Sequence, residues 1–113
     1  AGLFLSACGG GDEFKPSSEA EKKAVNLIKR KSADAKILSF SVAQKEFSLK
    51  DRECLKSKGT MDIDDVIDIY FVKLPNGEIQ VREVLFNNRT NGGALSDTYT
   101  LEQIKAKKPE CFN

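Results

Sequence analysis

The residues with the clearest potential for chemistry are three cysteines, at positions 8, 54 and 111. A thiol can serve as a nucleophile, a metal ligand, a lipid attachment point or one half of a disulfide. The chain has no histidine, which removes the usual general base of a nucleophile pair and the commonest metal ligand. No glycine-rich phosphate loop follows an expected strand. The sequence therefore predicts a protein that is not an enzyme, and it assigns no catalytic, cofactor-binding or metal-binding residue.

Cys8 ends a short ordered motif, Leu5-Ser6-Ala7-Cys8, which follows an apolar run and precedes three glycines. This order resembles the lipobox at the end of a bacterial lipoprotein signal peptide. The resemblance implies that residues 1–7 are a signal-peptide remnant and that acyl chains such as palmitate are attached to Cys8. The alternative is a cloning scar, or an ordinary apolar strand that happens to end in cysteine.

The same resemblance implies a place in the cell envelope, with the protein bound to the membrane through the lipid on Cys8. In Gram-negative bacteria, an Asp directly after the lipidated cysteine favours retention of the lipoprotein in the inner membrane. Gly9 occupies that position here, so for a Gram-negative source the resemblance implies the outer membrane. In a Gram-positive source the anchor would hold the protein on the outer face of the single membrane. Residues 8–17 are expected to be the lipidated cysteine and a flexible tether, because glycine and polar residues offer little to bury.

Two cysteines remain once Cys8 is assigned to lipid. Exported proteins can keep disulfides, so the cysteine count predicts a Cys54–Cys111 bridge. Closing so long a loop would stabilise the fold by about 4 kcal/mol in the chain-entropy model and would hold the C-terminus in place. The alternative is a pair of buried free thiols, which pack as small hydrophobic side chains.

A second group of potentially reactive side chains is the acidic run at residues 62–68. Calcium loops also place carboxylates at alternate positions, but they need a glycine at the sixth position and a glutamate at the twelfth. Ile67 and Lys73 occupy those positions here. The run is therefore interpreted as a charged approach to a hydrophobic strand, which discourages pairing between sheet edges.

Two helices are predicted at the ends of a single globular domain, residues 18–113. Ser18 and Glu21 have the spacing of a capping box, and an apolar stripe follows them. Thr100 and Gln103 have the same spacing and begin a short C-terminal helix.

A β-hairpin is predicted for residues 66–74 and 79–86, because Asn76 and Gly77 stand between two runs rich in β-branched and aromatic residues. A two-residue loop would place Leu74 opposite Ile79, and it would pair the preceding residues of the first strand with the following residues of the second in the same register.

Alternating apolar residues also predict a strand at 36–42, with a slip near 43–46 that would be a bulge or a strand break. Residues 50–60, with room for one helical turn, and 87–97 are expected to be loops because of their charge or their Gly and Asn content.

These elements indicate an α+β fold, in which the N-terminal helix packs on an antiparallel sheet of three or four strands and a short helix ends the chain. A helix followed by a curled meander is similar to cystatin-like and other small lipoprotein domains. That similarity is architectural and carries no function.

Eighteen basic residues stand against seventeen acidic ones, so no global charge favours nucleic acid as a partner. The leading hypothesis is a non-catalytic, lipid-anchored envelope protein that binds another protein, as an accessory subunit of a surface or secretion assembly. The first alternative is a lipoprotein inhibitor of a foreign enzyme or phage, with loop 87–97 as its binding loop. The second is a small-ligand carrier or enzyme with a pocket between helix and sheet.

Overall fold

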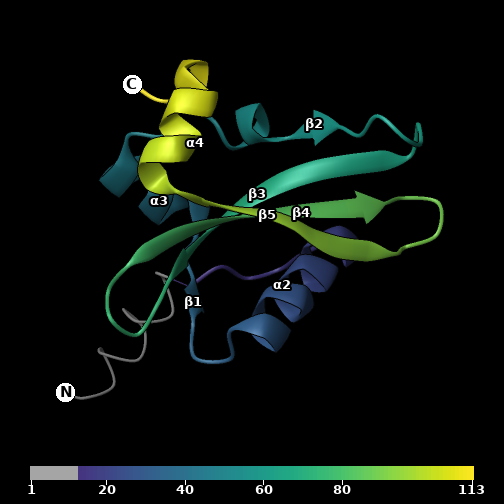
Figure 1. The fold of residues 1–113 in the computed structure, drawn as a ribbon, viewed down its shortest axis with the longest axis horizontal. Coiled ribbons are helices and arrows are strands. Elements are labelled where there is room, and N and C mark those ends of the chain that lie inside the picture. The colour runs from purple at the N-terminus through teal and green to yellow at the C-terminus, as the bar shows by residue number, and fades with distance from the viewer. Residues whose placement is uncertain (1–12) are drawn as a thin grey trace.

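The computed structural model describes residues 13–113, and these residues adopt the predicted α+β fold. The elements in chain order are α2 (Glu19–Lys31), β1 (Lys36–Ile37), α3 (Phe40–Phe47), the 3₁₀ helix η1 (Arg52–Leu55), β2 (Ser57–Lys58), β3 (Asp65–Lys73), β4 (Ile79–Asn87), β5 (Gly93–Thr100), α4 (Leu101–Lys107) and the 3₁₀ helix η2 (Pro109–Cys111) (Figure 1). All strands belong to one antiparallel sheet in the order β1-β3-β4-β5, and β2 pairs with β3 beside β1. Among the described helices, none is long and apolar enough to cross a membrane.

The sheet has a hydrophobic core on each face, because successive side chains of β3 and β4 point to opposite sides. The cluster under α2 consists of Ala24, Ile28, Ala35, Ile37, Tyr70, Val72 and Val84. The cluster under α3, α4 and the end of the chain includes Ile69, Phe71, Val81, Ile104 and Phe112. One face therefore packs on α2 and the other on α3, α4 and the C-terminal residues.

Both predicted helix starts are present. The hydroxyl of Ser18 accepts a hydrogen bond from the backbone N–H of Glu21 at 3.2 Å, while the Glu21 carboxylate accepts from the backbone of Ser17 at 2.8 Å. Thr100 and Gln103 form a complete capping box at the start of α4. Each cap satisfies backbone donors that the first helical turn leaves without a partner.

The predicted strand at 36–42 is wrong beyond Ile37, since α3 begins at Phe40. The side chain of Ser39 accepts from the backbone N–H of Val42 at 3.3 Å, which makes Ser39 a helix cap. Phe40 and Phe47 then face the core at helical spacing, together with Ala43. Residues 43–46, where the alternation of apolar residues slips, thus belong to a helix and form neither a bulge nor a strand break.

The hairpin is present, but its predicted register is wrong by one residue, because Lys73 rather than Leu74 lies opposite Ile79. The backbone N–H of Gly77 donates to the carbonyl of Leu74 at 2.8 Å, and Gly77 has a φ of 90°. Pro75 has the fixed φ that suits the first position of a type I turn, which a left-handed Gly77 then closes. The loop therefore has three residues instead of two.

The predicted loop at 87–97 is also shorter than expected, since β5 begins at Gly93 and pairs with β4 along its length. Among the described residues, β5 pairs with no other strand and forms one edge of the sheet. The helical turn expected within 50–60 is η1.

Glu13 and Phe14 pack on the domain, so the expected flexible tether at 9–17 does not include them. Glu13 pairs with Leu38 in a β-bridge, and the backbone N–H of Phe14 donates to the carbonyl of Ile37 at 2.8 Å. The Phe14 ring meets the ring of Tyr70 edge to face at 5.4 Å. An aromatic side chain in such a polar stretch gains stability by burial.

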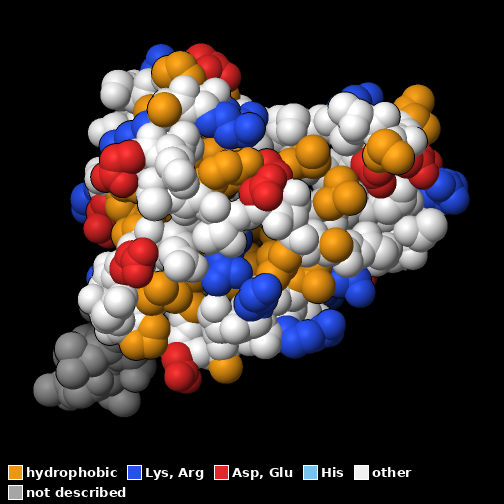
Figure 2. Space-filling model, viewed as in Figure 1, with side chains coloured by type: hydrophobic (Ala, Val, Ile, Leu, Met, Phe, Trp, Pro, Cys, Tyr) orange, Lys and Arg blue, Asp and Glu red, His pale blue; other side chains and the backbone are white. Residues whose placement is uncertain are grey.

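The strands β3, β4 and β5 continue past the helices to one end of the molecule, on the right in Figure 1. The connections from β2 to β3 and from β4 to β5 lie there side by side. We call residues 59–64 and 88–92 the tip. Figure 2 shows hydrophobic and acidic side chains gathered on the surface at this end.

Candidate functional site

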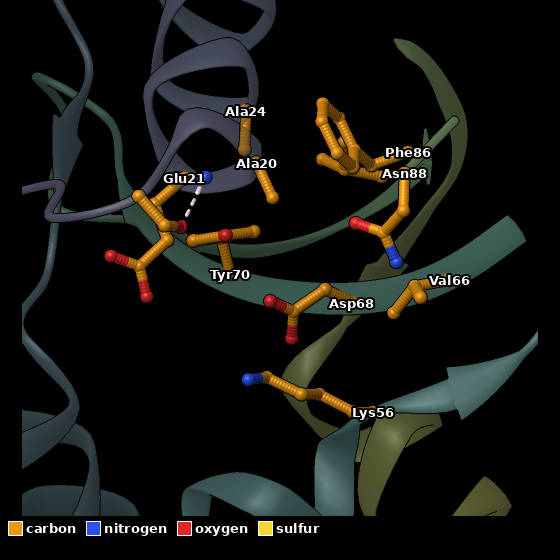
Figure 3. Close-up of a pocket in the computed structure, with 11 residues that line it drawn as sticks. Ala20, Glu21, Ala24, Lys56, Val66, Asp68, Tyr70, Phe86 and Asn88 are labelled. Carbon is orange, nitrogen blue, oxygen red and sulfur yellow. Dashed lines mark hydrogen bonds between the residues drawn. The ribbon is translucent and has the colours of Figure 1, made fainter. Parts of the chain in front are cut away.

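A pocket of about 280 Å³ lies between the start of α2 and the sheet (Figure 3). Apolar side chains of α2, β3 and β4 line it together with the polar side chains of Ser18, Glu21, Lys56, Asp68, Tyr70 and Asn88. Figure 3 shows the Lys56 side chain running beneath Asp68, and its amino group forms an ion pair with Glu53 at 3.1 Å. This is the pocket between helix and sheet that a small-ligand carrier or an enzyme would need.

The charged groups of this pocket are already engaged in holding the fold together. Arg52, on η1, donates two hydrogen bonds to Asp68, at 2.7 and 2.6 Å, and its guanidinium lies 3.9 Å from the centre of the Phe40 ring. Glu21 is 3.8 Å from the same guanidinium. A half-buried bidentate ion pair stacked on an aromatic ring joins η1, β3 and α2, which is a structural role.

Tyr70 contributes to the pocket a hydroxyl whose pKa is raised. Burial raises the pKa of its hydroxyl, and the charge of Asp68 raises it further, while the charge of Arg52 lowers it. The net pKa lies well above the ordinary value for tyrosine. The pocket offers apolar walls and several hydrogen-bonding groups to a small ligand.

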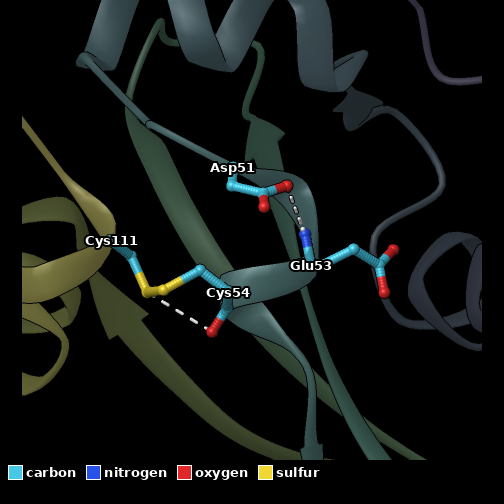
Figure 4. The surroundings of a disulfide bond; sticks show 4 residues. All are labelled: Asp51, Glu53, Cys54 and Cys111. Atoms are coloured by element: carbon cyan, nitrogen blue, oxygen red, sulfur yellow. Dashed lines mark hydrogen bonds between the residues drawn. A yellow bond between two sulfur atoms is a disulfide. The ribbon is translucent and has the colours of Figure 1, made fainter.

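Cys54 and Cys111 form the disulfide that the cysteine count predicted (Figure 4). Their Cα atoms are 5.7 Å apart, and 57 positions separate them in the sequence. Backbone hydrogen bonds tie the same two segments together, because Lys50 donates to the carbonyl of Cys111 and Asn113 donates to that of Ser48, both at 2.8 Å. The bridge fastens the end of the chain to η1.

Glu110 lies close to both sulfurs, so three side chains of ligand type meet at this point. Sulfurs that are bonded to each other have no thiolate to donate to a metal. In the oxidised protein this group is a structural link.

The carboxylates of the acidic run at 62–68 bind to several different partners and do not converge on one point. Arg89 forms an ion pair with Asp62 and donates to Asp64 at 3.3 Å. The side-chain amide of Asn87 donates to Asp65 at 2.7 Å, while Asp68 belongs to Arg52. The carboxylates are therefore held by different partners.

These ion pairs fix the shape of the tip. The Asp62 carboxylate also accepts from the backbone N–H of Asp64 at 3.0 Å, and this bond, followed by the one from Arg89, lowers the pKa of Asp62. Gly59 lies against β3 so closely that a Cβ atom there would be 2.6 Å from the Cβ of Asp65. The 59–64 connection is thus held to both neighbours, β3 and the 88–92 connection.

The 88–92 connection is equally well fixed. The Asn87 side chain accepts hydrogen bonds from the backbone N–H groups of Arg89 and Thr90, at 3.0 and 2.9 Å. The carbonyl of Asn87 accepts from the backbone N–H of Asn91 at 2.8 Å, and Asn91 has a φ of 60°. Asparagine suits both positions because its side chain bonds to nearby backbone and it tolerates the left-handed region.

Two large hydrophobic side chains protrude from this fixed tip. Met61 is 92% exposed and Ile63 is 84% exposed. They alternate with Asp62 and Asp64, whose carboxylates are held by Arg89. The sequence reading missed all of this, because alternation of apolar and acidic residues is also the pattern of an ordinary strand with one buried face.

The Leu5-Ser6-Ala7-Cys8 motif and Cys8 itself lie outside the described residues. Comparison of the chain with protein-family models, with curated proteins and with solved structures finds no match. The function therefore has to be inferred from the sequence and from the local geometry of the described residues.

Proposed function

We propose that this protein is a non-catalytic, lipid-anchored protein of the bacterial cell envelope that binds another protein through its tip. The observation that carries the proposal is the exposure of Met61 and Ile63 on connections that ion pairs and hydrogen bonds hold in place. Met61 and Ile63 protrude together from one small surface, and an exposed apolar patch that is rimmed by polar residues marks a site of interaction with a partner.

The arrangement has the features of a binding hot spot. Two apolar side chains occupy the centre, and the charged pairs of Asp62, Asp64 and Arg89 surround them, as a polar rim surrounds an interface core. The connections are fixed before any partner arrives, so binding would cost little conformational entropy. The partner we propose is a protein with an apolar cleft into which Met61 and Ile63 insert.

The test is site-specific crosslinking in the native cells. A photoactivatable amino acid replaces Ile63 in one strain and Glu46, on the exposed side of α3, in a control strain. We expect a discrete crosslinked adduct from position 63 and none of the same mass from position 46. Equal adducts from both positions, or none from either, would contradict the proposal.

The same experiment separates the leading function from an inhibitor of a foreign enzyme or phage. Two fixed connections side by side also form a wedge of the kind that can block a cleft, which keeps the inhibitor as the second candidate. A partner from the cell's own envelope supports an accessory subunit. A partner captured only when phage or a foreign enzyme is added supports the inhibitor.

The anchor rests on the lipobox-like motif at Cys8. Only residues 9–12 separate Cys8 from Glu13, which packs on the domain, and a chain of that length spans at most about 17 Å. A lipidated Cys8 would therefore hold the domain close to the membrane. With Gly9 after the cysteine, we propose the outer membrane for a Gram-negative source.

Replacement of the thiol tests the anchor separately. Cys8→Ser, expressed with a complete signal peptide, should lose labelling by radioactive palmitate and leave the membrane fraction. Retention in the membrane fraction as a cleaved protein after a high-salt wash would contradict lipid anchoring.

A further inference from the structure

A groove of about 370 Å³ runs between α2 and the first residues of β5, on a different surface from the tip. Leu27, Arg30 and Lys31 line it from the helix, and Gly93, Ala94 and Leu95 line it from the strand. Figure 2 shows Lys and Arg side chains, with hydrophobic ones between them, over the region that α2 and β5 occupy in Figure 1.

Gly93 allows the helix and the strand to come this close. A Cβ atom at that position would lie 2.9 Å from Cγ of Lys23 and 3.4 Å from Cδ1 of Leu27. Ala94 pairs with Leu85, so its side chain points to the face opposite α2. Because Ala94 still lines the groove, the groove reaches the outer backbone edge of β5.

That edge offers hydrogen-bonding groups to an incoming strand. The carbonyl of Gly92 accepts from the backbone N–H of Asn87 at 2.8 Å, so the polar groups of Gly92 face β4. Because these groups alternate in direction along an antiparallel strand, the N–H and C=O groups of Gly93 and Leu95 face outward. Within residues 13–113 no strand pairs with that side of β5.

The first residues of β5, Gly93 to Leu95, carry none of the prolines or charges that protect an edge strand, and the bulge in the pairing of β5 with β4 lies beyond Leu95. The strand contains no proline and no lysine, and Asp97 is its single charged residue. Such an edge is a template for the addition of another strand.

The charges beside the groove select what can be added. Lys23, Arg30 and Lys31 form no ion pair with any residue of the described chain. Arg30 and Lys31 are exposed at the groove, while half-buried Leu27 and Leu95 give it an apolar floor. An extended segment that carries carboxylates next to apolar side chains would match both features.

We propose that the groove between α2 and β5 binds an extended acidic peptide segment of a protein partner, which pairs with the outer edge of β5 as an additional strand. The backbone supplies the hydrogen bonds, Leu27 and Leu95 receive an apolar side chain, and Arg30 and Lys31 receive carboxylates. This site is independent of the tip.

The experiment uses the full chain and a synthetic octapeptide, Val-Thr-Glu-Thr-Val-Thr-Glu-Thr, in which valine and glutamate alternate along one face of the strand, since successive side chains point to opposite faces. Two further peptides are compared with it, one with lysine in place of glutamate and one with alternate backbone amides methylated. On adding the first peptide at millimolar concentration, we expect the amide protons of Gly93 and Leu95 to shift and to exchange with solvent at least about tenfold more slowly. The lysine and methylated peptides should produce neither effect.

A charge reversal at the groove, Arg30→Glu/Lys31→Glu, should weaken binding of the first peptide at least about tenfold. Its matched control is Lys45→Glu/Lys50→Glu, which makes the same change in net charge on exposed side chains elsewhere. An equal loss in the control, equal binding of the methylated peptide, or no binding of the first peptide would overturn the proposal.

Two other occupants would also overturn it. If the Gly93 and Leu95 amides are already protected in the free protein and lose protection on dilution to a monomer, a second copy occupies the edge. If they lose protection when residues 1–12 are removed, the chain's own N-terminal segment occupies it.

Discussion

The disulfide region and the tip are both built from irregular connections held by specific bonds, yet they use those bonds differently. Around Cys54 and Cys111 the apolar side chains of Leu55, Ile104 and Phe112 are buried, and the bonds close a core. At the tip the polar groups are paired just as completely, while Met61 and Ile63 stand in solvent. The hydrogen bonds and ion pairs of the tip enclose no hydrophobic core, so they only fix the conformation of its two connections. A fixed conformation that exposes apolar side chains is suited to binding a partner.

The largest effect on stability is expected at the disulfide. Cys54→Ala/Cys111→Ala should lower the free energy of unfolding by about 3 kcal/mol, because the unfolded chain regains the freedom of a long loop. Denaturant unfolding of both proteins under oxidising conditions measures the difference. A loss below about 1 kcal/mol would mean that the backbone bonds at Lys50 and Asn113 suffice to hold the chain end.

A smaller loss, about 2 kcal/mol, is expected from Arg52→Met, since the Asp68 carboxylate then loses its cation at a half-buried place. The matched variants are Asp68→Asn and the double variant, measured by the same unfolding experiment. We expect the double variant to lose less than the sum of the two single losses, because the residues act as a pair. Simple additivity would show that the pair is not coupled.

At the tip, stability should hardly change. Met61→Asp/Ile63→Asp removes side chains that touch little, so the free energy of unfolding should move by less than about 0.5 kcal/mol. Thermal unfolding of this variant and of Ser41→Asp/Gln44→Asp, which adds the same charge on exposed positions of α3, gives the comparison. A large loss would show that the two side chains support the fold and are not reserved for a partner.

The smallest effect concerns the ion pairs of the tip and pH. The N–H of Asp64 and the Arg89 guanidinium hold the pKa of Asp62 below the ordinary value in the folded protein. The bonds are therefore present at neutral pH and are lost as the pH falls through the lowered pKa of the folded state. Carboxyl chemical shifts followed by NMR should show Asp62 titrating below the ordinary range and moving back toward it in Arg89→Ala. An unchanged pKa in that variant would contradict the pairing.

Much of the fold followed from local signals in the sequence. The caps at Ser18 and Thr100 and the central hairpin were predicted because each depends on a few adjacent residues. The hairpin register was missed because Pro75 moves the turn by one residue. The helix α3 was missed because Leu38, Phe40 and Val42 alternate with the period of a strand. The helix begins after the cap at Ser39 instead, and its core positions are Phe40, Ala43 and Phe47.

The candidate sites followed less well. The disulfide could be predicted because a count of cysteines is enough once Cys8 is set aside. The tip could not, because its character depends on the pairing of Arg89 with Asp62, twenty-seven positions away in the sequence. The groove depends on β5, and the glycines at 92 and 93 made that strand look like a loop.

The most direct test of the role of the tip is the affinity for the protein captured by crosslinking at position 63. Isothermal titration of that protein should give a dissociation constant at least about thirtyfold weaker for Met61→Asp/Ile63→Asp than for the unmodified protein. The Ser41→Asp/Gln44→Asp control should bind as the unmodified protein does. If the tip variant, still folded and as stable as before, binds with unchanged affinity, the tip is not the binding site.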